Sequence, residues 1–415
     1  MSGSPAGLNR RSLLKAGGVS LLSGSGVVLR AQPGARADVL PSQLHLQFGA
    51  DAARQMTVSW VTAGGVARPR LRLGAPHSGP QHVVEAQTRV YRDSRSGRET
   101  VIHHVPLSGL RPDSGYVYEV LHDGGAASGG SFRTAPAGRA PLRFTSFGDQ
   151  GAGDGHLASS VWAEYLVDQV EAKNPLFHLL NGDLAYSNQA ADRAAAWDAF
   201  FANNSRSARH RPWMPSVGNH ENEFGNGELG FNAYRTRYSL PSNGSADYSG
   251  LWYSFKAGSV FVVSLDNNDA CYQEAADLYL RGYSDGAQRQ WLETTLHAAR
   301  ADPEVDWIVV SMHQLALSAA LANGSDLGVR EAWLDLFDRY DVDLVLAGHD
   351  HAYERSHLVR GFEADSPTRR PAVVSTEDGV LDATKGTVHL VVGTGGAPTI
   401  EGLYTFTNAG VPLHG

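Results

Sequence analysis

Cysteine is almost absent from this chain of 415 residues, in which Cys271 is the single example. One cysteine can form neither an internal disulfide nor a cysteine-based metal site, so an incidental role is the simplest interpretation of this thiol. Long apolar runs are also missing, because no stretch approaches the roughly 20 apolar residues that a membrane-spanning helix needs. With 42% hydrophobic residues and no evident repeat, the sequence is typical of a globular protein long enough for two domains.

Positive charge is scarce outside the N-terminal segment. The formal net charge of the whole chain is −8. Residues 1–37 contain five basic residues and no acidic one, so removal of this segment would change the net charge to −13. A surface that acidic argues against nucleic acid or an anionic membrane as a standing partner, because both are bound through clustered lysine and arginine. The five basic residues are Arg10, Arg11, Lys15, Arg30 and Arg36.

The N-terminal segment has the pattern of an export signal. The pair Arg10-Arg11 precedes a short apolar run over residues 16–29 that is rich in glycine and serine, and Ala35-Arg36-Ala37 ends it. A twin arginine, a short apolar region and a small-x-small end predict a twin-arginine signal over residues 1–37 that is cleaved before Asp38. Such a route suits a protein that folds, with any cofactor it needs, before it is exported to the periplasm or the medium.

Residues 38–136 predict an all-β sandwich domain. Segments 43–48, 55–61 and 116–120 alternate apolar and polar residues at period two, as half-buried strands do. Short strands separated by turns over about 95 residues are typical of a β-sandwich. His103 and His104 are adjacent and therefore point to opposite faces of a strand, so a structural role is expected for both. The proline-containing segment 135–141 is the predicted linker.

Residues 137–415 predict a second domain in which strands and helices alternate. Segments 156–173, 287–300 and 330–340 have helical periodicity, and each leads into the next strand. The apolar segments 252–255 and 260–265 are expected to be strands that complete the sheet edges. His178 is interpreted as a core histidine. Residues 266–269 are interpreted as a turn that could reach the rim of the candidate site described below.

Five apolar strands of this second domain each run directly into polar side chains that can bind metals. Because the carboxyl ends of parallel strands meet at one edge of a sheet, these side chains are expected to gather there. The strand segments are 142–147, 176–180, 213–217, 307–311 and 343–347. The candidate residues that follow them are Asp149, Asp183, Tyr186, Asn219, His220, His313, His349 and His351.

Asp183 is the centre of this pattern. Taken alone, the Gly-Asp-x-x-Tyr sequence at 182–186 is usually a turn before a helix, but four further strand ends supply matching ligands. Carboxylate, amide and phenolate oxygens combined with imidazoles suit a pair of first-row transition metals. Two metals bridged by a carboxylate and a hydroxide can drive phosphoryl transfer. His220 follows Asn219 and remains free to give a proton to the leaving alkoxide or to hold a phosphate oxygen.

These blocks resemble those of the purple acid phosphatases within the metallophosphoesterase superfamily, over residues 40–400. The sequence Gly-His-Asp-His-Ala-Tyr-Glu-Arg at 348–355 is especially similar to the last block of that family. The first block lacks the histidine that most of the superfamily has two residues after Asp149, and Tyr186 is present in its place. The resemblance implies an exported bacterial member with a fibronectin-III-like N-terminal domain before an α/β, four-layer αββα catalytic domain.

The resemblance also implies the metals and their ligands. A ferric ion would be bound by Asp149, Asp183, Tyr186 and His351. A divalent ion, Fe²⁺, Zn²⁺ or Mn²⁺, would be bound by Asp183, Asn219, His313 and His349. Asp183 would bridge the two ions and share the catalytic role with His220, which would contact the substrate.

The sequence departs from the pattern of the larger plant members in two places. Residues 316–323 contain no histidine, whereas those members carry a substrate-contacting histidine pair there. The chain also ends soon after residues 391–396, so we expect a truncated C-terminus and an unpaired sheet edge near the site.

The expected function is hydrolysis of phosphomonoesters by an exported acid phosphatase that uses a metal-bound hydroxide. A phosphodiesterase of the same superfamily is the alternative within the same class. A metal- or phosphate-binding envelope protein without turnover is the alternative outside it. The presence of His220 favours an enzyme, because a protein that only holds metal has no use for this side chain.

Overall fold

The structure is a computed structural model that describes residues 39–151, 161–273, 276–320 and 323–397. The predicted export signal and the C-terminal residues 398–415, which bear on the expected truncation, lie outside the described residues. None of the described helices is both long enough and apolar enough to cross a membrane.

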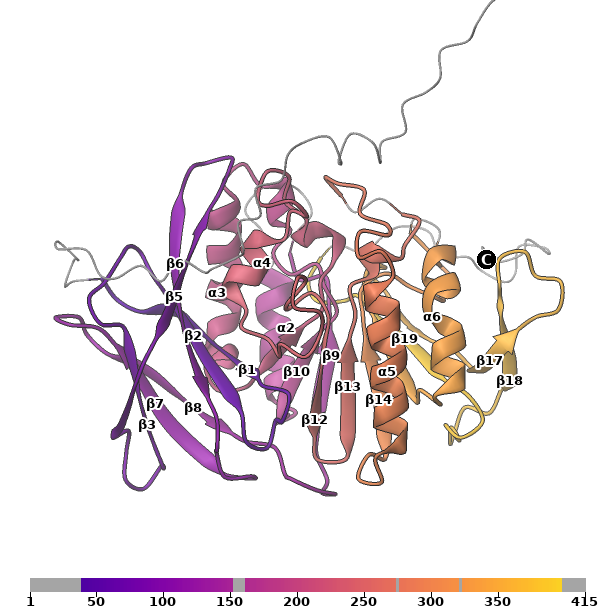
Figure 1. Cartoon of the computed structure of the whole chain (residues 1–415), viewed down its shortest axis with the longest axis horizontal. Helices are drawn as coiled ribbons and strands as arrows, with labels where there is room; N and C mark the ends of the chain where they lie inside the picture. The colour runs from indigo at the N-terminus through magenta and orange to yellow at the C-terminus, as the bar shows by residue number, and fades with distance from the viewer. Residues whose placement is uncertain (1–38, 152–160, 274–275, 321–322, 398–415) are drawn as a thin grey trace, which may run out of the picture.

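The N-terminal part is a sandwich of two four-stranded sheets, at the left of Figure 1. Their strand orders are β1-β2-β6-β5 and β4-β3-β7-β8, and every pairing is antiparallel. Strands such as β3 alternate buried and half-buried residues, which is the pattern of a sheet with one face on the core. The bounds are β1 Ser42–Phe48, β2 Met56–Thr62, β3 Arg70–Gly74, β4 His82–Glu85, β5 Gln87–Arg92, β6 Glu99–Leu107, β7 Gly115–Leu121 and β8 Ser128–Arg133.

The second part contains a three-stranded sheet and a six-stranded sheet. The three-stranded sheet, β11-β10-β9, is parallel throughout. The six-stranded sheet has the order β12-β13-β14-β15-β19-β16, with four parallel central strands and an antiparallel strand at each edge. A separate hairpin pairs β17 with β18. The bounds are β9 Phe144–Phe147, β10 Phe177–Leu180, β11 Trp213–Pro215, β12 Tyr253–Ala257, β13 Val260–Ser264, β14 Trp307–Ser311, β15 Leu344–Ala347, β16 Tyr353–Arg355, β17 Leu358–Phe362, β18 Pro371–Ser375 and β19 Val388–Val392.

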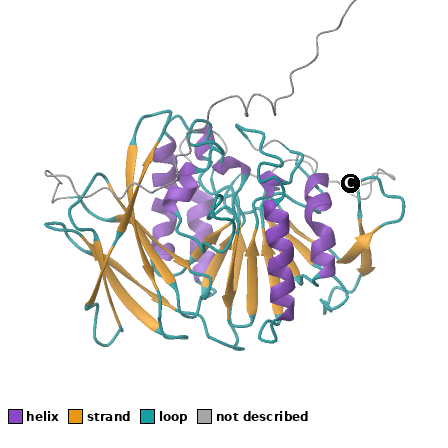
Figure 2. Ribbon diagram, viewed as in Figure 1, coloured by secondary structure: helices purple, strands orange, loops and turns teal. Residues whose placement is uncertain are grey.

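Helices cover the outer faces of both sheets, as the ribbon in Figure 2 shows. The α-helices are α2 Val161–Glu171, α3 Arg193–Ala208, α4 Asn232–Arg237, α5 Ala287–Ala301 and α6 Leu327–Arg339. Three short 3₁₀ helices are η1 Ser187–Gln189, η2 Asn219–Glu221 and η3 Asn267–Asp269.

Alternate side chains of the central strands enter different cores, and this creates the layers. Val309 of β14 packs with Leu179 of β10 in the core between the two sheets. The next residue, Val310, packs with α5 and α6 in an outer core. On the opposite side, Leu180 of β10 packs with Phe200 of α3. The predicted four-layer αββα arrangement behind an all-β domain is therefore confirmed.

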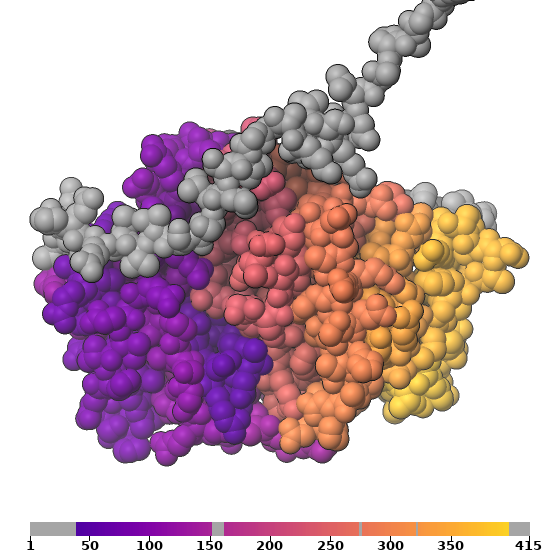
Figure 3. Space-filling model, viewed as in Figure 1, coloured from indigo at the N-terminus to yellow at the C-terminus, as the bar shows by residue number. Residues whose placement is uncertain are grey.

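The sandwich shares a core with the second part. Phe48 at the end of β1 lies 5.7 Å from the ring of Phe177 and 6.0 Å from that of Phe255, measured between ring centroids. Gln43 of β1 also donates a hydrogen bond of 2.6 Å to Asp198 of α3. Figure 3 shows the two parts in contact over a broad front. Direct packing of this kind allows side chains of the sandwich to approach the loops that follow the strands of the second part.

One expectation about the strands was wrong, and one helix was not predicted. Residues 260–265 were expected at a sheet edge, but β13 lies between β12 and β14. The sequence analysis also missed α3, in which Asn204 and Ser207 are buried together with Trp197. Polar residues on the buried side obscure the apolar stripe that reveals an amphipathic helix. The expected helix over 156–173 is described only from residue 161, as α2.

Candidate metal centre

Asn181 joins the two sheets at the edge where the predicted ligands gather. Its side chain accepts a hydrogen bond of 2.5 Å from Ser146 of β9. Its amide nitrogen donates to Ser311 of β14 at 3.0 Å and to the carbonyl of Leu346 in β15 at 2.9 Å. Asn181 is fully buried, so these bonds satisfy a polar group that would otherwise be costly. These bonds hold the ends of the connected strands together, so the loops that follow them lie at the same edge of the two sheets.

Three predicted residues converge around the ring of His313, which is itself a candidate ligand. Its Nε2 lies 3.0 Å from Oδ2 of Asp183, 2.9 Å from Oδ1 of Asn219 and 3.2 Å from Nδ1 of His349. The other ring nitrogen of His313 contacts the carbonyl of Asn181 at 2.6 Å, and this contact assigns the hydrogen to Nδ1 in the neutral ring. Nε2 then presents a lone pair to three further acceptors. Ligand atoms of Asp183, His313 and His349 lie within 4.8 Å of one another.

A second group consists of Asp149, Tyr186 and His351. The Tyr186 hydroxyl lies 2.9 Å from Nε2 of His351 and 3.4 Å from Oδ1 of Asp149. Nε2 of His351 is 3.5 Å from the same carboxylate oxygen. The two groups are neighbours, because the backbone N–H of His349 binds both oxygens of Asp149 at 3.1 and 3.0 Å.

The chemistry of these donors fits a pair of cations. Burial lowers the pKa of His313, but the charge of Asp183 and its hydrogen bond outweigh this effect and raise the pKa to about 10. The site therefore stabilises positive charge between buried acceptors. Burial and the carboxylates of Asp149 and Asp183 raise the pKa of Tyr186 well above its usual value. The phenol would thus lose its proton only to a strong Lewis acid.

Four of the predicted residues have a backbone conformation that side chains disfavour. The φ angles are 60° at Asp149, 51° at Asp183, 49° at Tyr186 and 70° at His349. Left-handed conformations of this kind persist where the surroundings enforce them, and they concentrate at functional sites. Gly182 also needs to lack a side chain, because at φ 76° a Cβ there would lie 2.7 Å from the His313 ring. Local strain thus accompanies the convergence of the donors.

Glu221 supports the site, although sequence reasoning did not select it. Its carboxylate accepts hydrogen bonds from the backbone of Gly218 at 2.8 Å, Asp183 at 2.9 Å and Leu184 at 2.8 Å. Burial and the nearby Asp183 carboxylate raise the pKa of Glu221 to about 8. Glu221 therefore ties the loop of Asp183 to the loop of Asn219. The sequence feature that could have indicated this role is its position, because Glu221 directly follows the candidate residues Asn219 and His220.

The turn after β13 has a similar supporting role. Asn267 accepts a hydrogen bond of 2.8 Å from the backbone of His313, and Asn268 donates one of 3.3 Å to the carbonyl of Gly218. Both asparagines are fully buried. The expectation of a turn near the rim is correct, and the structure adds that this turn holds two of the loops that carry candidate ligands.

His220 differs from the other candidates because it lies at the rim. Its ring stacks on Tyr186 at 4.2 Å, and its Nδ1 lies 2.9 Å from Oδ1 of Asn188. Nε2 is 3.9 Å from Oδ2 of Asp183. The side chain of His220 is 19% exposed, whereas that of Asp183 is 3% exposed. Asn188 fixes the orientation of the ring and leaves Nε2 available on the side of the donors.

The N-terminal sandwich reaches this rim through Arg95 in the turn between β5 and β6. Its Nη1 donates to the carbonyl of Asn188 at 2.6 Å and to that of Ala190 at 3.1 Å. Its Nη2 also lies 3.7 Å from Asp277. The sandwich therefore contributes to the positioning of His220, through Asn188. No motif in the sequence points to this contact.

Two amide side chains contact His349, and one of them belongs to the segment 316–323 that contains no histidine. Gln273 places Oε1 at 2.5 Å from Nε2 of His349. Asn323, the last residue of the segment without histidine, donates to the carbonyl of His349 at 2.9 Å. Amide groups thus occupy this side of the site in the part of the chain that the structure describes.

Comparisons with known proteins agree with this geometry. The profile of the purple acid phosphatase N-terminal domain matches residues 41–134, and that of the calcineurin-like phosphoesterases matches residues 152–353. An uncharacterised protein of Mycobacterium tuberculosis is 49% identical over 418 residues, which cover 94% of this chain and 79% of that protein. The Fe(3+)-Zn(2+) purple acid phosphatase 12 of Arabidopsis thaliana is 28% identical, with 88% and 73% covered. The structure of the yellow lupin purple acid phosphatase PPD1 has the same fold, with a TM-score of 0.70 and 20% identity over 89% of this chain and 67% of that one.

Proposed function

The chain belongs to the purple acid phosphatase family of metallophosphoesterases, and from this premise we propose that it is an exported acid phosphatase acting on phosphomonoesters. Membership of the family makes it a phosphoester hydrolase with a binuclear metal centre. The class of ester, the identity of the metals and the export route are the proposed parts.

The proposed metals are a ferric ion and a divalent ion, either Fe²⁺, Zn²⁺ or Mn²⁺. The group of Asp149, Tyr186 and His351 would hold the ferric ion, because a phenolate and carboxylates suit a hard trivalent cation. The group around His313 would hold the divalent ion, and Asp183 would bridge the two. When bound, the metal pair supplies Lewis acidity and lowers the pKa of coordinated water.

The residues of this chain then have separate tasks. His313 and Glu221 keep the loops of Asn181 and Asp183 in place, through the carbonyl and amide contacts described above. Asn188 orients His220, whose Nε2 can deliver a proton to the leaving alkoxide or hold a phosphate oxygen. Proton delivery of this kind typically contributes about 10²- to 10⁴-fold to the rate.

The position of His220 is the observation that carries the proposal of an enzyme. Its ring lies beside the donor groups, is partly exposed and is oriented by a hydrogen bond to Asn188. His220 is not itself one of the seven candidate metal ligands. A protein that only binds metal or phosphate would not need this arrangement. A phosphodiesterase would need it equally, so the ester class requires a direct measurement.

The decisive experiment uses the purified mature protein with its metals quantified. A chromogenic phosphomonoester and the matching diester are assayed in parallel, with His220→Ala as the control for adventitious activity. We expect faster hydrolysis of the monoester by the wild type and loss of both activities in the variant. Faster diester hydrolysis would favour the alternative enzyme, and a fully metallated protein without turnover would favour a binding protein.

Tyr186 separates the proposed iron site from other binuclear centres. A phenolate bound to a ferric ion gives a charge-transfer band in visible light, whereas a zinc, magnesium or manganese pair held by Asp and His gives no such colour. We expect the oxidised, iron-loaded protein to be violet to pink and Tyr186→Phe to be colourless at matched iron content. A colourless wild type, or an unchanged band in the variant, would remove Tyr186 from the ligands.

Export through the twin-arginine pathway is proposed from Arg10 and Arg11 in the N-terminal segment. The test replaces both arginines by lysine, which preserves the charge and removes the motif. The precursor is then expected to stay in the cytoplasm, and unchanged export of the variant would contradict this route.

A further inference from the structure

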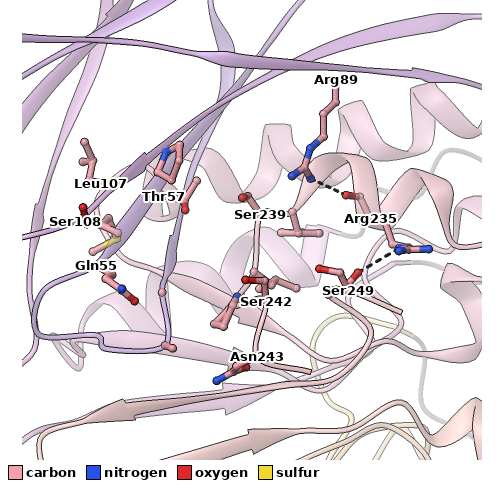
Figure 4. Close-up of a pocket in the computed structure, with 18 residues that line it drawn as sticks. Gln55, Thr57, Arg89, Leu107, Ser108, Arg235, Ser239, Ser242, Asn243 and Ser249 are labelled. Carbon is pink, nitrogen blue, oxygen red and sulfur yellow. Dashed lines mark hydrogen bonds between the residues drawn. The ribbon is translucent and has the colours of Figure 1, made fainter. Parts of the chain in front are cut away.

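A cavity lies at the junction between the sandwich and the catalytic part. It has a volume of about 600 Å³ and none of its lining residues is a candidate metal ligand. Figure 4 shows Gln55, Thr57 and Leu107 from the sandwich strands on one side, and Ser239 and Ser242 from the segment after α4 on the other. Junctions between domains are frequent locations of small-molecule sites, and this volume is in the range of such sites.

The lining of this junction cavity is basic although the chain is acidic overall. Arg89 and Arg235 line it, and no aspartate or glutamate does. The remaining polar side chains carry hydroxyl or amide groups, and Met56 and Leu240 add apolar surface. The chain has a net charge of −8, so a cavity with two arginines and no carboxylate differs in charge from the protein as a whole.

The two arginines have no carboxylate partner among the described residues. Arg89 donates to the backbone carbonyl of Arg235 at 3.1 Å, and Arg235 donates to that of Ser249 at 3.2 Å, as the dashed lines in Figure 4 show. Arg235 also donates to the carbonyl of Asp247 at 3.3 Å. In another surface cavity, by contrast, Arg98 forms an ion pair with Asp198.

The electrostatics of the pair favour a bound anion. Burial, and then the charge of Arg235, lower the pKa of Arg89, and burial lowers the pKa of Arg235 as well. Arg89 therefore has a second positive charge nearby, and neither guanidinium group has a carboxylate partner among the described residues. An oxyanion bound in the cavity would offset this charge and accept charge-assisted hydrogen bonds.

We propose that the junction cavity binds a small organic phosphate, with its phosphate group at Arg89 and Arg235 and its body against Met56 and Leu240. The volume favours an organic phosphate over free inorganic phosphate, which would fill only a small part of it. This second site is separate from the metal centre and does not depend on the proposed hydrolysis.

Benzylphosphonate is a suitable probe because it has no ester bond to hydrolyse. It can also bind the metal centre, so calorimetry on the metallated protein measures the total number of sites, and inhibition of turnover measures occupancy of the metal centre alone. We expect about two sites in the wild type. Arg89→Ala should weaken one of them by at least about tenfold and leave the inhibition constant unchanged.

Matched variants make this test specific. Arg72→Ala removes the same charge from a sandwich arginine that is paired with Glu119, and it should leave both sites intact. Arg235→Gln should act like Arg89→Ala, and Arg89→Lys should restore part of the affinity. Metal content and turnover of every variant confirm that the fold is preserved.

The outcomes separate the proposal from its alternatives. A single site in the wild type, or a second site that neither Arg89→Ala nor Arg235→Gln affects, would overturn the proposal. A parallel titration with inorganic phosphate distinguishes the two sources of the oxyanion. Weaker binding of inorganic phosphate than of benzylphosphonate at the junction cavity supports the organic ligand, and equal or tighter binding overturns that assignment.

Discussion

Two sets of buried histidines distinguish the sandwich from the catalytic part. In the sandwich, each ring of His103 and His104 has both nitrogens within 2.9 Å of a hydroxyl or a backbone carbonyl. In the catalytic part, the rings of His313 and His349 approach each other to 3.2 Å and face a carboxylate. Burial is the same in both sets, so the groups around the ring nitrogens, and not burial, identify a functional histidine.

The pKa values of His103 and His313 show the same contrast, whereas burial and the charge of His313 hold the pKa of His349 well below its usual value. Burial, and then the charge of His122, lower the pKa of His103 to about 3, and threonine hydroxyls contact both nitrogens of the neutral ring. For His313 the Asp183 carboxylate overcomes burial and raises the pKa to about 10. The sandwich thus excludes positive charge from its histidines, whereas the catalytic edge attracts it. A cation can occupy only the second environment at low cost.

Removal of the proposed bridge should give the largest effect. Asp183→Asn is expected to lose both metals and all activity. Among the described residues, the neutral amide would replace the only carboxylate in contact with His313, and Asp183 is the one group proposed for both ligand sets. Elemental analysis and the phosphomonoester assay measure these changes.

Asp350→Asn is the matched control, since this buried carboxylate accepts hydrogen bonds from Ser318 and Gly324 and is not a candidate ligand. It should keep both metals. Retention of two metals by Asp183→Asn would contradict the bridging role and weaken the distinction between the two sets of histidines.

His220 should give the next largest effect. Its variant should distinguish the proposed proton donor from the histidines that are candidate metal ligands. His220→Ala is expected to keep both metals and to lose about 10²- to 10⁴-fold in kcat, because the ring contacts Asn188 and Tyr186 and is the proposed proton donor. Metal content is measured on the same sample as the rate. A metal-free variant would show that His220 is a ligand.

The sequence predicted the location of the candidate site because that location depends on topology. Apolar strands that end in Asp149, Asp183 or His349 place these residues at one edge whenever the strands are parallel. The fold class followed from the same alternation and from the resemblance to a known family. The interior position of β13 was also accessible, since an unbroken apolar run indicates a strand that is buried on both faces.

The supporting contacts were beyond sequence reasoning. Asn181 connects strands of two different sheets, and Arg95 reaches a loop about a hundred residues later in the chain. Such pairs have no spacing rule, because they depend on how the layers and domains pack. Glu221 is intermediate: it is next to a recognised motif, but its backbone partners appear only in the folded chain.

Arg95 tests whether the sandwich contributes to catalysis, and a smaller effect is expected. Arg95→Ala should lower kcat about tenfold with metal content unchanged, because the Asn188 carbonyl loses its donor and His220 loses its fixed position. KM should change less than kcat if only the proton donor is displaced. Arg95→Lys should recover part of the rate, whereas a merely structural defect would lower the melting temperature and the metal content together.

The smallest effect on the metal centre is expected from His103, although this residue should control stability in acid. Its pKa is about 3 in the folded state and 6.5 in the ordinary, unfolded state, so the unfolded chain binds more protons between these values. His103 therefore contributes stability above pH 6.5 that is lost as the pH falls, by about 2.7 kcal/mol at pH 4.5. This penalty continues to grow until the pH falls to about 3, where the folded-state ring also becomes protonated.

His103→Gln should remove this penalty while it costs about 1–2 kcal/mol at pH 7 through less favourable hydrogen bonds to Thr62 and Thr88. Urea unfolding at pH 7 and pH 4.5 should then show a smaller loss of stability in acid for the variant than for the wild type, at unchanged metal content. His77→Gln, at an exposed position of the sandwich, is the control and should not alter the difference. Equal losses for His103→Gln and the wild type would mean that His103 is not kept neutral by its surroundings, and the contrast with His313 would then rest on geometry alone.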